Sequence, residues 1–222
     1  MSRVVTFDAG ETLVELDLDF LAARLASRGV TCEPRALRTR LRAAWAHHDA
    51  LGDVGHEARW RGLMATLLGC ATDDDAVSWL WREQPRANLW RKPIAGVVAV
   101  AGELAARGVT VGVISNSEGT IAELLASVGI ACGEVIDSGV VGVAKPDPRI
   151  FELALARFGG GCAPRDAIHV GDAWAADVEG ALAAGWRAVW YGPRVMACAR
   201  DGVFVARDPS ELADVLWAEV SR

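Results

Sequence analysis

Lysine is almost absent from this sequence of 222 residues, which contains only Lys92 and Lys145. The other basic residues are arginines, and acidic residues outnumber basic ones, giving a formal net charge of -6. An excess of negative charge gives no electrostatic reason to bind nucleic acid or an anionic membrane. We therefore expect neither as a partner, and a lysine inside a motif stands out against this background.

Paired cysteines and long apolar runs are also missing. The five cysteines are odd in number, widely spaced and form no CxxC pair, which argues against a disulfide framework and a zinc site; they are Cys32, Cys70, Cys132, Cys162 and Cys198. The apolar stretch from Ile94 ends at Glu103, well short of the ~18 residues of a membrane span. The N-terminus lacks the pattern of a secretion signal. We expect a cytoplasmic protein.

Hydrophobic residues make up 52% of the chain and charged residues 23%, as in compact folded proteins and unlike disordered ones. Between residues 17 and 84, apolar residues recur three or four positions apart, which predicts amphipathic helices. Four are expected, over residues 17–29, 33–48, 56–69 and 72–84. Thr72 and Asp75 have the spacing of a capping box at the start of the fourth.

After Pro93 the pattern changes to alternating helices and strands. Near-continuous apolar strands alternating with helices are typical of a parallel sheet covered on both faces. Strands are expected at residues 3–7, 109–115, 134–138, 167–172 and 187–192, with a short strand near residue 204. The sequence therefore predicts an α/β core domain, residues 1–14 and 92–222, with an α-helical cap, residues 15–91, inserted after the first strand.

Polar side chains occur where several predicted strands end. Because the carboxyl ends of parallel strands meet at one edge of the sheet, these side chains are expected to converge; they are Asp8, Ser115, Asn116, Lys145, Asp172 and Asp177. A carboxylate can attack phosphorus or carbon, a hydroxyl and an ammonium can hold an anionic group, and carboxylates bind Mg²⁺. Together these groups suit attack on a phosphoryl group.

Four motifs resemble those of the haloacid dehalogenase-like hydrolase superfamily, in the branch whose helical cap is inserted between the first and second motifs. They are FDAGETL, VISNSEG, GVAKPDPRIF and HVGDAWAADVEGALAAG, and the resemblance covers nearly the whole chain. It implies a Rossmann-like parallel-sheet core with helices on both faces. It also implies a hydrolase that forms a covalent intermediate on an aspartate.

The resemblance implies a role for each motif residue. Asp8 would be the nucleophile that becomes an aspartyl-phosphate, and Lys145 would act with it. Phosphate would be bound by Ser115, Asn116 and Lys145. Mg²⁺ would be held by Asp8, the backbone carbonyl of Gly10 and Asp172, with Asp177 and Thr12 in support. Trp174, in the same loop as Asp172, could form a wall of the pocket.

Gly10 departs from the family pattern. Family phosphatases usually read Asp-x-Asp-Gly-Thr, and the second Asp protonates the leaving oxygen; here residues 8–12 are Asp, Ala, Gly, Glu and Thr. Such general acid catalysis accelerates the reaction by ~10²–10⁴-fold. Its loss should therefore slow the hydrolysis of substrates with poor leaving groups most. Glu11, His47 or His48 could supply the proton instead, or no residue does.

Three functions therefore remain open. The first is a Mg²⁺-dependent phosphatase acting on a small phosphorylated metabolite. The second is a metal-independent 2-haloacid-type dehalogenase, since dehalogenases of the superfamily also lack the second Asp, although they usually lack the Gly-Asp that ends in Asp172. The third is a catalytically silent binding or interaction protein that keeps the fold. Phosphonate hydrolysis fits poorly, because it needs a cap lysine and Lys92 lies where the cap returns to the core. The sequence specifies neither the substrate nor the oligomeric state.

Overall fold

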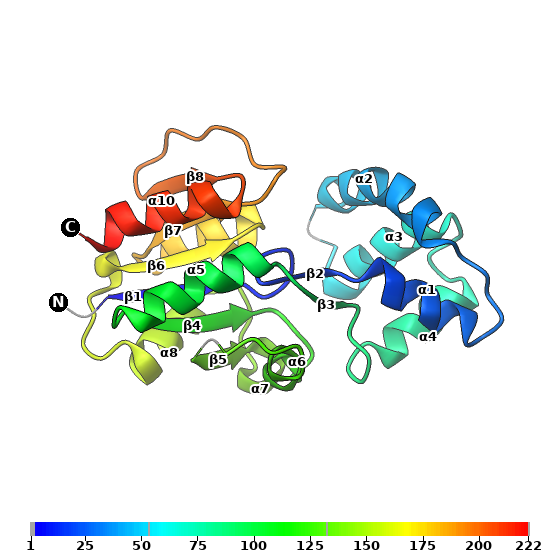
Figure 1. The fold of residues 1–222 in the computed structure, drawn as a ribbon, viewed down its shortest axis with the longest axis horizontal. Helices are drawn as coiled ribbons and strands as arrows, with labels where there is room; N and C mark the ends of the chain where they lie inside the picture. Colours follow the sequence, from blue (N-terminus) through cyan, green and yellow to red (C-terminus); the bar gives the residue numbers. More distant parts are fainter. Residues whose placement is uncertain (1–2, 53, 132, 222) are drawn as a thin grey trace. The chain divides into compact units, whose positions relative to one another are not determined.

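The computed structural model describes residues 3–52, 54–131 and 133–221 (Figure 1). The chain forms two compact units, one of Met1–Leu16 with Trp90–Arg222 and one of Asp17–Leu89. Among the described residues, no helix has both the length and the apolar character needed to cross a membrane. The four described cysteines form no disulfide, and Cys132 lies outside the described residues.

A six-stranded parallel sheet forms the centre of the first unit. Its strand order is β5-β4-β1-β6-β7-β8, and every neighbouring pair is parallel. The strands are β1 (Val4–Phe7), β4 (Thr110–Ser115), β5 (Glu134–Asp137), β6 (Ala167–Gly171), β7 (Arg187–Tyr191) and β8 (Val203–Ala206). The predicted α/β class is confirmed. The apolar first strand lies between β4 and β6, where its residues are buried.

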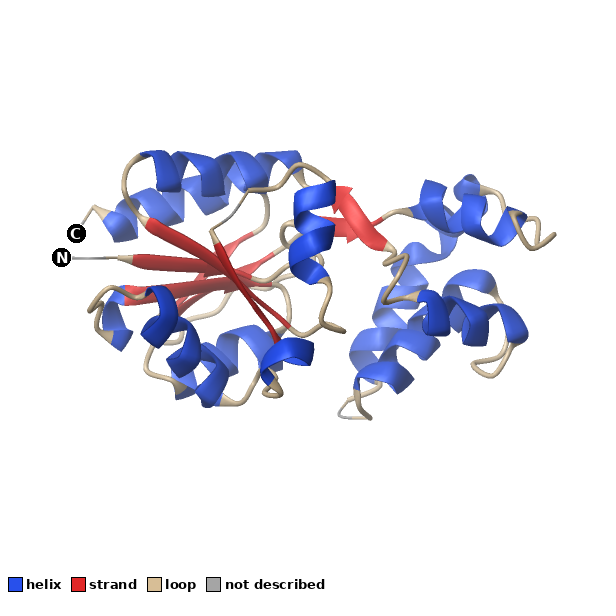
Figure 2. Cartoon of the chain, turned by 90° about the horizontal axis from the view of Figure 1, so that it is seen from below, coloured by secondary structure: helices blue, strands red, loops and turns tan. Residues whose placement is uncertain are grey.

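Helices cover both faces of this sheet (Figure 2). One core cluster packs the sheet against α5 (Ala95–Ala106), α6 (Ile121–Ser127) and α10 (Pro209–Val220), and the other against α8 (Pro148–Phe158) and α9 (Gly180–Ala183). Side chains alternate between the faces along a strand. Val5 and Phe7 therefore belong to the first cluster, whereas Val4 belongs to the second.

Several short elements were not expected from the sequence. The β2 (Val14–Leu16) and β3 (Trp90–Pro93) strands pair antiparallel where the chain leaves and re-enters the first unit. The α7 helix (Ser138–Val141) and a 3₁₀ turn, η1 (Pro164–Asp166), are also new. The helical segment after β6 begins as a π-helix, η2 (Trp174–Glu179), and only its second part, α9, is α-helical.

The second unit contains the four predicted helices. They are α1 (Leu18–Ala26), α2 (Pro34–Ala50), α3 (His56–Leu68) and α4 (Asp75–Glu83). Leu21, Leu37 and Leu63 are fully or almost fully buried in this unit. The predicted capping box on α4 is wrong, because the helix begins at Asp75 and its N-cap is Asp74, whose carboxylate accepts from the Ala76 N–H. That this unit acts as a cap over the site stays a prediction.

Candidate active site

Asp8 lies directly after β1, at the carboxyl edge of the sheet. Its backbone N–H donates to the Val170 carbonyl at 2.8 Å, which continues the pairing of β1 with β6. Its side chain is 14% exposed. Burial raises the pKa of the Asp8 carboxyl to about 6, although the charge of Lys145 opposes this rise. Asp8 is thus a sheltered carboxylate at the edge where the polar strand ends were expected to meet.

Lys145 is the charged partner of Asp8. Its Nζ donates to Asp8 Oδ1 at 2.7 Å, to Asp177 Oδ1 at 2.6 Å and to the Ile114 carbonyl at 2.7 Å. The side chain is only 2% exposed, and a buried ammonium is tolerated only when it is paired and hydrogen-bonded. Burial by itself lowers the pKa of Lys145, but the charges of Asp177 and Asp8 outweigh it and the pKa is raised. Lys145 therefore carries its charge at neutral pH.

Asn116 holds the backbone of Lys145. Its Nδ2 donates to the Lys145 carbonyl and its Oδ1 accepts from the Lys145 N–H, both at 2.8 Å. This pair of bonds ties the end of β4 to the loop that carries the lysine. The amide of Asn116 is thus engaged with protein backbone, and its predicted role in phosphate binding stays a prediction. Ser115, the last residue of β4, is buried beside it.

Asp177 is fully engaged by protein groups. Its Oδ1 accepts from Lys145 and is hydrogen-bonded to His169 Nε2 at 3.2 Å, while its Oδ2 accepts from the Ala173 N–H at 2.9 Å. Burial alone would raise the pKa of Asp177, but the Lys145 charge and the His169 hydrogen bond hold it below its usual range. A Cβ on Gly171 would lie 2.2 Å from Asp177 Cγ, so only glycine allows this approach. Asp177 is better placed to orient Lys145 than to ligate a metal.

Asp172 follows β6 and has a different environment. Its Oδ2 lies 3.3 Å from Arg194 Nη2, and its backbone carbonyl accepts from Trp190 Nε1 at 2.9 Å. Burial, followed by repulsion from Asp177 and Asp8, raises the pKa of Asp172 well above its usual range. Trp174 packs edge-on against Trp190, with ring centroids 4.8 Å apart, so the structure places it against another indole close to Asp172.

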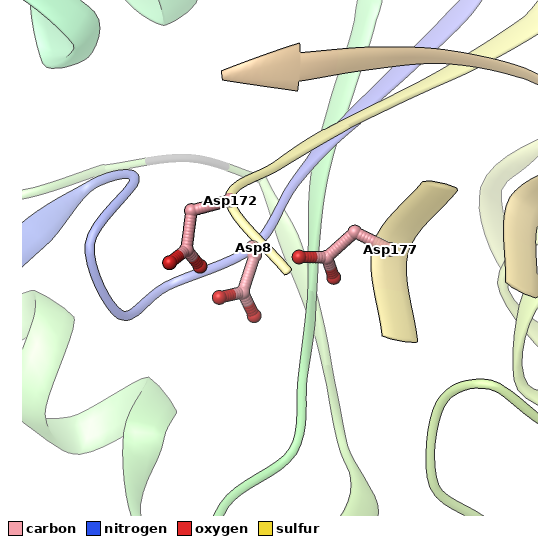
Figure 3. A group of neighbouring side chains, drawn as sticks. All are labelled: Asp8, Asp172 and Asp177. Carbon is pink, nitrogen blue, oxygen red and sulfur yellow. The ribbon is translucent and has the colours of Figure 1, made fainter. Parts of the chain in front are cut away.

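The three aspartates gather at one point (Figure 3). Asp8, Asp172 and Asp177 each offer a carboxylate oxygen, and these atoms lie within 4.8 Å of one another. Carboxylate oxygens are the ligands that Mg²⁺ prefers. Asp172 gains no full compensation from Arg194, since its pKa is still raised, and a divalent cation would supply the missing charge. Since Asp177 is already engaged, Asp8 and Asp172 are the side chains that fit such a cation.

Gly10 and Glu11 occupy the turn after Asp8. A Cβ on Gly10 would lie 3.4 Å from Trp90 Cδ1, which is ordinary contact, so the indole stands beside the position where family phosphatases carry the second Asp. Glu11 has φ +54°, a left-handed conformation that is uncommon outside glycine. Its Oε1 accepts from Trp90 Nε1 at 3.0 Å and from the Leu16 N–H at 3.4 Å. Glu11 is therefore tied to the β2–β3 pair.

The remaining predicted residues lie in different surroundings. Thr12 is completely buried, and its hydroxyl has no hydrogen-bond partner among the described residues. His47 and His48 belong to α2 in the second unit, where His48 Nδ1 lies 3.2 Å from Asp49 Oδ1. As replacement acids, Glu11, His47 and His48 stay predictions.

Two residues near the site were missed from the sequence. His169 is completely buried and bridges Thr6 to Asp177. Arg194 follows β7 in an irregular segment and reaches Asp172. His169 faces inward at an alternate position of a predicted strand, which was a usable signal because an inward polar group on a buried strand needs a partner. Arg194 has no comparable signal, since its position depends on the path of an irregular segment.

The chain belongs to the haloacid dehalogenase-like hydrolases. The model of that family matches residues 3–185, which include the whole candidate site from Asp8 to Asp177. The expected family is thereby confirmed.

Two curated relatives are phosphatases by name, and each is matched over part of its length. The chain is 42% identical over 95 residues to the phosphoserine phosphatase of Thermus thermophilus, covering 41% of this chain and 37% of that protein. It is 35% identical over 136 residues to the glyceraldehyde 3-phosphate phosphatase of Methanothermobacter thermautotrophicus, covering 56% of this chain and 59% of that protein. The chain thus spans between about a third and three fifths of these relatives.

A solved 2-haloacid dehalogenase is similar over nearly its whole length. The enzyme comes from Pseudomonas syringae pv. Tomato and has a TM-score of 0.59 and 26% identity, over 98% of this chain and 99% of that chain. This likeness supports the fold.

Proposed function

We propose that the chain is a Mg²⁺-dependent phosphatase that transfers the phosphoryl group of a small phosphorylated metabolite to Asp8. The observation that carries the proposal is the 2.7 Å contact of Lys145 Nζ with Asp8 Oδ1 beside the carboxylate of Asp172. A nucleophilic carboxylate, a fixed cation and a cation-binding carboxylate are the groups that attack on a phosphoryl group requires. The two phosphatase-named relatives support the same chemistry.

The first step is attack by a carboxylate oxygen of Asp8 on phosphorus. The new P–O bond forms as the ester P–O bond breaks, and the leaving group departs as an anion that takes a proton from solvent. Lys145 and Ser115 would bind non-bridging oxygens of the phosphoryl group, and Asn116 keeps the Lys145 loop in position. Water then attacks the aspartyl-phosphate, which releases inorganic phosphate and restores Asp8.

Asp8, Asp172 and the backbone carbonyl of Gly10 would hold Mg²⁺. The ion would supply positive charge against the transferring phosphoryl group. The protein contributes the position of Asp172, which the Trp190 indole fixes through the backbone carbonyl.

The proton for the leaving group has no donor in the usual place, because Gly10 has no side chain. Substrates whose leaving groups are stable as anions should therefore be turned over best. In the described geometry Glu11 already accepts two hydrogen bonds from the β2–β3 pair, and it would have to leave them to reach the leaving oxygen. This makes the nature of the leaving group the main determinant of rate.

Dehalogenation is the second candidate, and the missing second carboxylate favours it. Asp8 would then attack carbon and displace halide, a reaction for which no metal ligand is needed. Asp172 favours the phosphatase, because a partly buried carboxylate of raised pKa at the site is useful to a cation and has no role in halide displacement.

The test is hydrolysis of 4-nitrophenyl phosphate with and without Mg²⁺ by the natural protein, Asp8→Asn and Gly10→Asp. We expect turnover by the natural protein that requires Mg²⁺, none by Asp8→Asn, and faster turnover by Gly10→Asp, whose Cβ would make ordinary contact with Trp90. Halide release from 2-chloropropionate is measured in parallel without metal. Halide release without phosphate release would replace the phosphatase with the dehalogenase.

A further inference from the structure

We propose that Thr6 and His169 are positioning residues that hold Asp177, and through it Lys145, in place against Asp8. This inference rests on the proposed function for its consequence, since it concerns how the site of that reaction is kept in order. Neither residue is exposed to solvent. Both act through other side chains, from inside the sheet.

The strand register brings the two residues together. Thr6 of β1 and His169 of β6 are direct neighbours in the parallel ladder, so their side chains emerge on the same face of the sheet. Thr6 Oγ1 lies 2.8 Å from His169 Nδ1, and both residues are completely buried. Asp8, two residues after Thr6, follows the same alternation. The strand that carries the nucleophile thus also carries the support for its partner.

The imidazole is neutral, and this decides what it can donate. Burial lowers the pKa of His169 to about 4, so one ring nitrogen carries a proton and the other accepts. Asp177 is ionised, as the Lys145 contact requires. A lone pair on Nε2 facing that carboxylate at 3.2 Å would be repelled. The proton therefore lies on Nε2, which donates a hydrogen bond to Asp177. Nδ1 accepts a hydrogen bond from the Thr6 hydroxyl.

The bonds form a continuous buried chain from Thr6 through His169, Asp177 and Lys145 to Asp8. Phe151 fixes the ring plane of His169 by an edge-on contact, with centroids 5.2 Å apart. Asp177 Oδ1 is oriented by His169, and the same oxygen receives Lys145. Loss of the Thr6 hydroxyl would leave Nδ1 without its hydrogen-bond partner and remove the contact that holds the ring on the side away from Asp177. The ring could then lose its bond to Asp177, and the position of Lys145 would be less well defined.

The experiment compares Thr6→Val, which has the same shape without the hydroxyl, with Thr6→Ser, which keeps the hydroxyl. Val4→Ala is the matched control, since Val4 is completely buried on the same strand and the same face but lies outside the chain of hydrogen bonds. Activity on 4-nitrophenyl phosphate with Mg²⁺, melting temperature, and the His169 tautomer by ¹H–¹⁵N NMR are measured for each. His169→Gln identifies the His169 signals.

We expect Thr6→Val to lose about 10-fold or more in kcat/KM, the loss typical of a residue that orients a site group. Thr6→Ser should keep most of the activity, and Val4→Ala should keep it despite a lower melting temperature. His169→Leu should lose at least as much as Thr6→Val, and His169→Gln should recover part because its amide can donate to Asp177. The natural protein should show the Nε2–H tautomer, which Asp177 selects, and Thr6→Val should keep it but shift the Nδ1 signal, because Nδ1 loses its hydrogen bond.

An Nδ1–H tautomer in the natural protein would overturn the inference. The inference would also be overturned if Thr6→Val and His169→Leu kept the same kcat/KM as Val4→Ala. If the natural protein hydrolyses no phosphate ester, the proposed function fails, and the tautomer measurement still decides whether Thr6 and His169 orient Asp177. The two failures are therefore distinguishable.

Discussion

At the scale of single residues, Glu11 has the least expected conformation of the site. It is a non-glycine residue with positive φ, and its carboxyl lies in a low-dielectric environment. Backbone strain of this kind costs about 1–3 kcal/mol and persists only where the surroundings enforce it. Here the enforcing contacts are Trp90 and Leu16, the first residue of β3 and the last residue of β2.

The ionisation of Glu11 should affect stability. Burial raises the pKa of its carboxyl from 4.5 to about 7. Between these values the unfolded chain releases the proton and the folded protein keeps it, so the contribution of Glu11 to stability falls as pH rises through that window. Glu11→Gln carries no such proton. The free energy of unfolding of Glu11→Gln should therefore rise relative to the natural protein by about 1–3 kcal/mol between pH 4.5 and pH 7.

Urea denaturation of both proteins in EDTA at several pH values measures this difference. The comparison cancels the groups that both proteins share. A difference that stays constant across the window would show that the Glu11 carboxyl titrates as an ordinary surface acid.

At the scale of elements, the turn from β6 into the π-helix η2 brings Asp177 back to the sheet. The extra residue in a π-turn changes the direction of the side chains that follow, and π-helical turns are frequent at functional sites. Asp177 lies inside η2, and its Oδ2 caps the Ala173 N–H just before it. Gly171, the last residue of β6, leaves the space that this return requires.

Gly171→Ala should therefore destabilise the protein and disturb the site. Its Cβ would lie 2.2 Å from Asp177 Cγ, and overpacking of this kind costs about 1–3 kcal/mol. Gly102→Ala is the control, because Gly102 lies in α5 with no neighbouring atom within 4 Å and alanine favours a helix by about 0.5–1 kcal/mol. Thermal and urea unfolding should separate the two. Equal stability of both variants would mean that Asp177 moves aside without cost.

The larger elements were predictable from the sequence because their signals are local. The apolar β1 strand and the amphipathic helices of the second unit each show their period over several residues. The β2–β3 pair was not predictable, since each strand is short and pairs with a segment more than 70 residues away, as the contact of Leu16 with Trp90 illustrates. The π-helix likewise has the apolar spacing of an ordinary helix.

The candidate site was predictable in part for the same reason. Asp8 and Asp172 follow strands, and the sheet brings strand ends together, so their convergence follows from topology. Other features depend on loop paths and side-chain rotamers. Examples are the two bonds of Asn116 to the Lys145 backbone and the three hydrogen bonds made to Asp177. Neither arrangement produces a repeating pattern in the sequence.

At the scale of the whole molecule, three carboxylates of this acidic chain meet at one point. Asp8, Asp172 and Asp177 lie together, and repulsion contributes to the raised pKa of Asp172. A cation that binds only the folded protein stabilises it by mass action, by about 2.7 kcal/mol at a concentration 100 times its dissociation constant. Mg²⁺ should therefore raise the melting temperature of the natural protein.

Asp172→Asn should abolish that rise. Because it also removes a repelled and desolvated carboxylate, it should be at least as stable as the natural protein when Mg²⁺ is absent. Asp147→Asn is the control, since Asp147 is an exposed helix cap paired with Arg149 and its replacement should leave the effect of Mg²⁺ intact. If Mg²⁺ leaves the melting temperature of the natural protein unchanged, the proposed metal site is wrong.

The central claim is that Asp8 accepts a phosphoryl group, and rapid quenching of a single turnover tests it most directly. Without a second Asp to activate water, the aspartyl-phosphate should break down slowly and accumulate. With ³²P-labelled aryl phosphate and Mg²⁺, the account predicts acid-stable, hydroxylamine-labile label on Asp8 of the natural protein, less on Gly10→Asp, and none on Asp8→Asn. Release of phosphate without labelled protein, with Asp8→Asn as active as the natural protein, would contradict it.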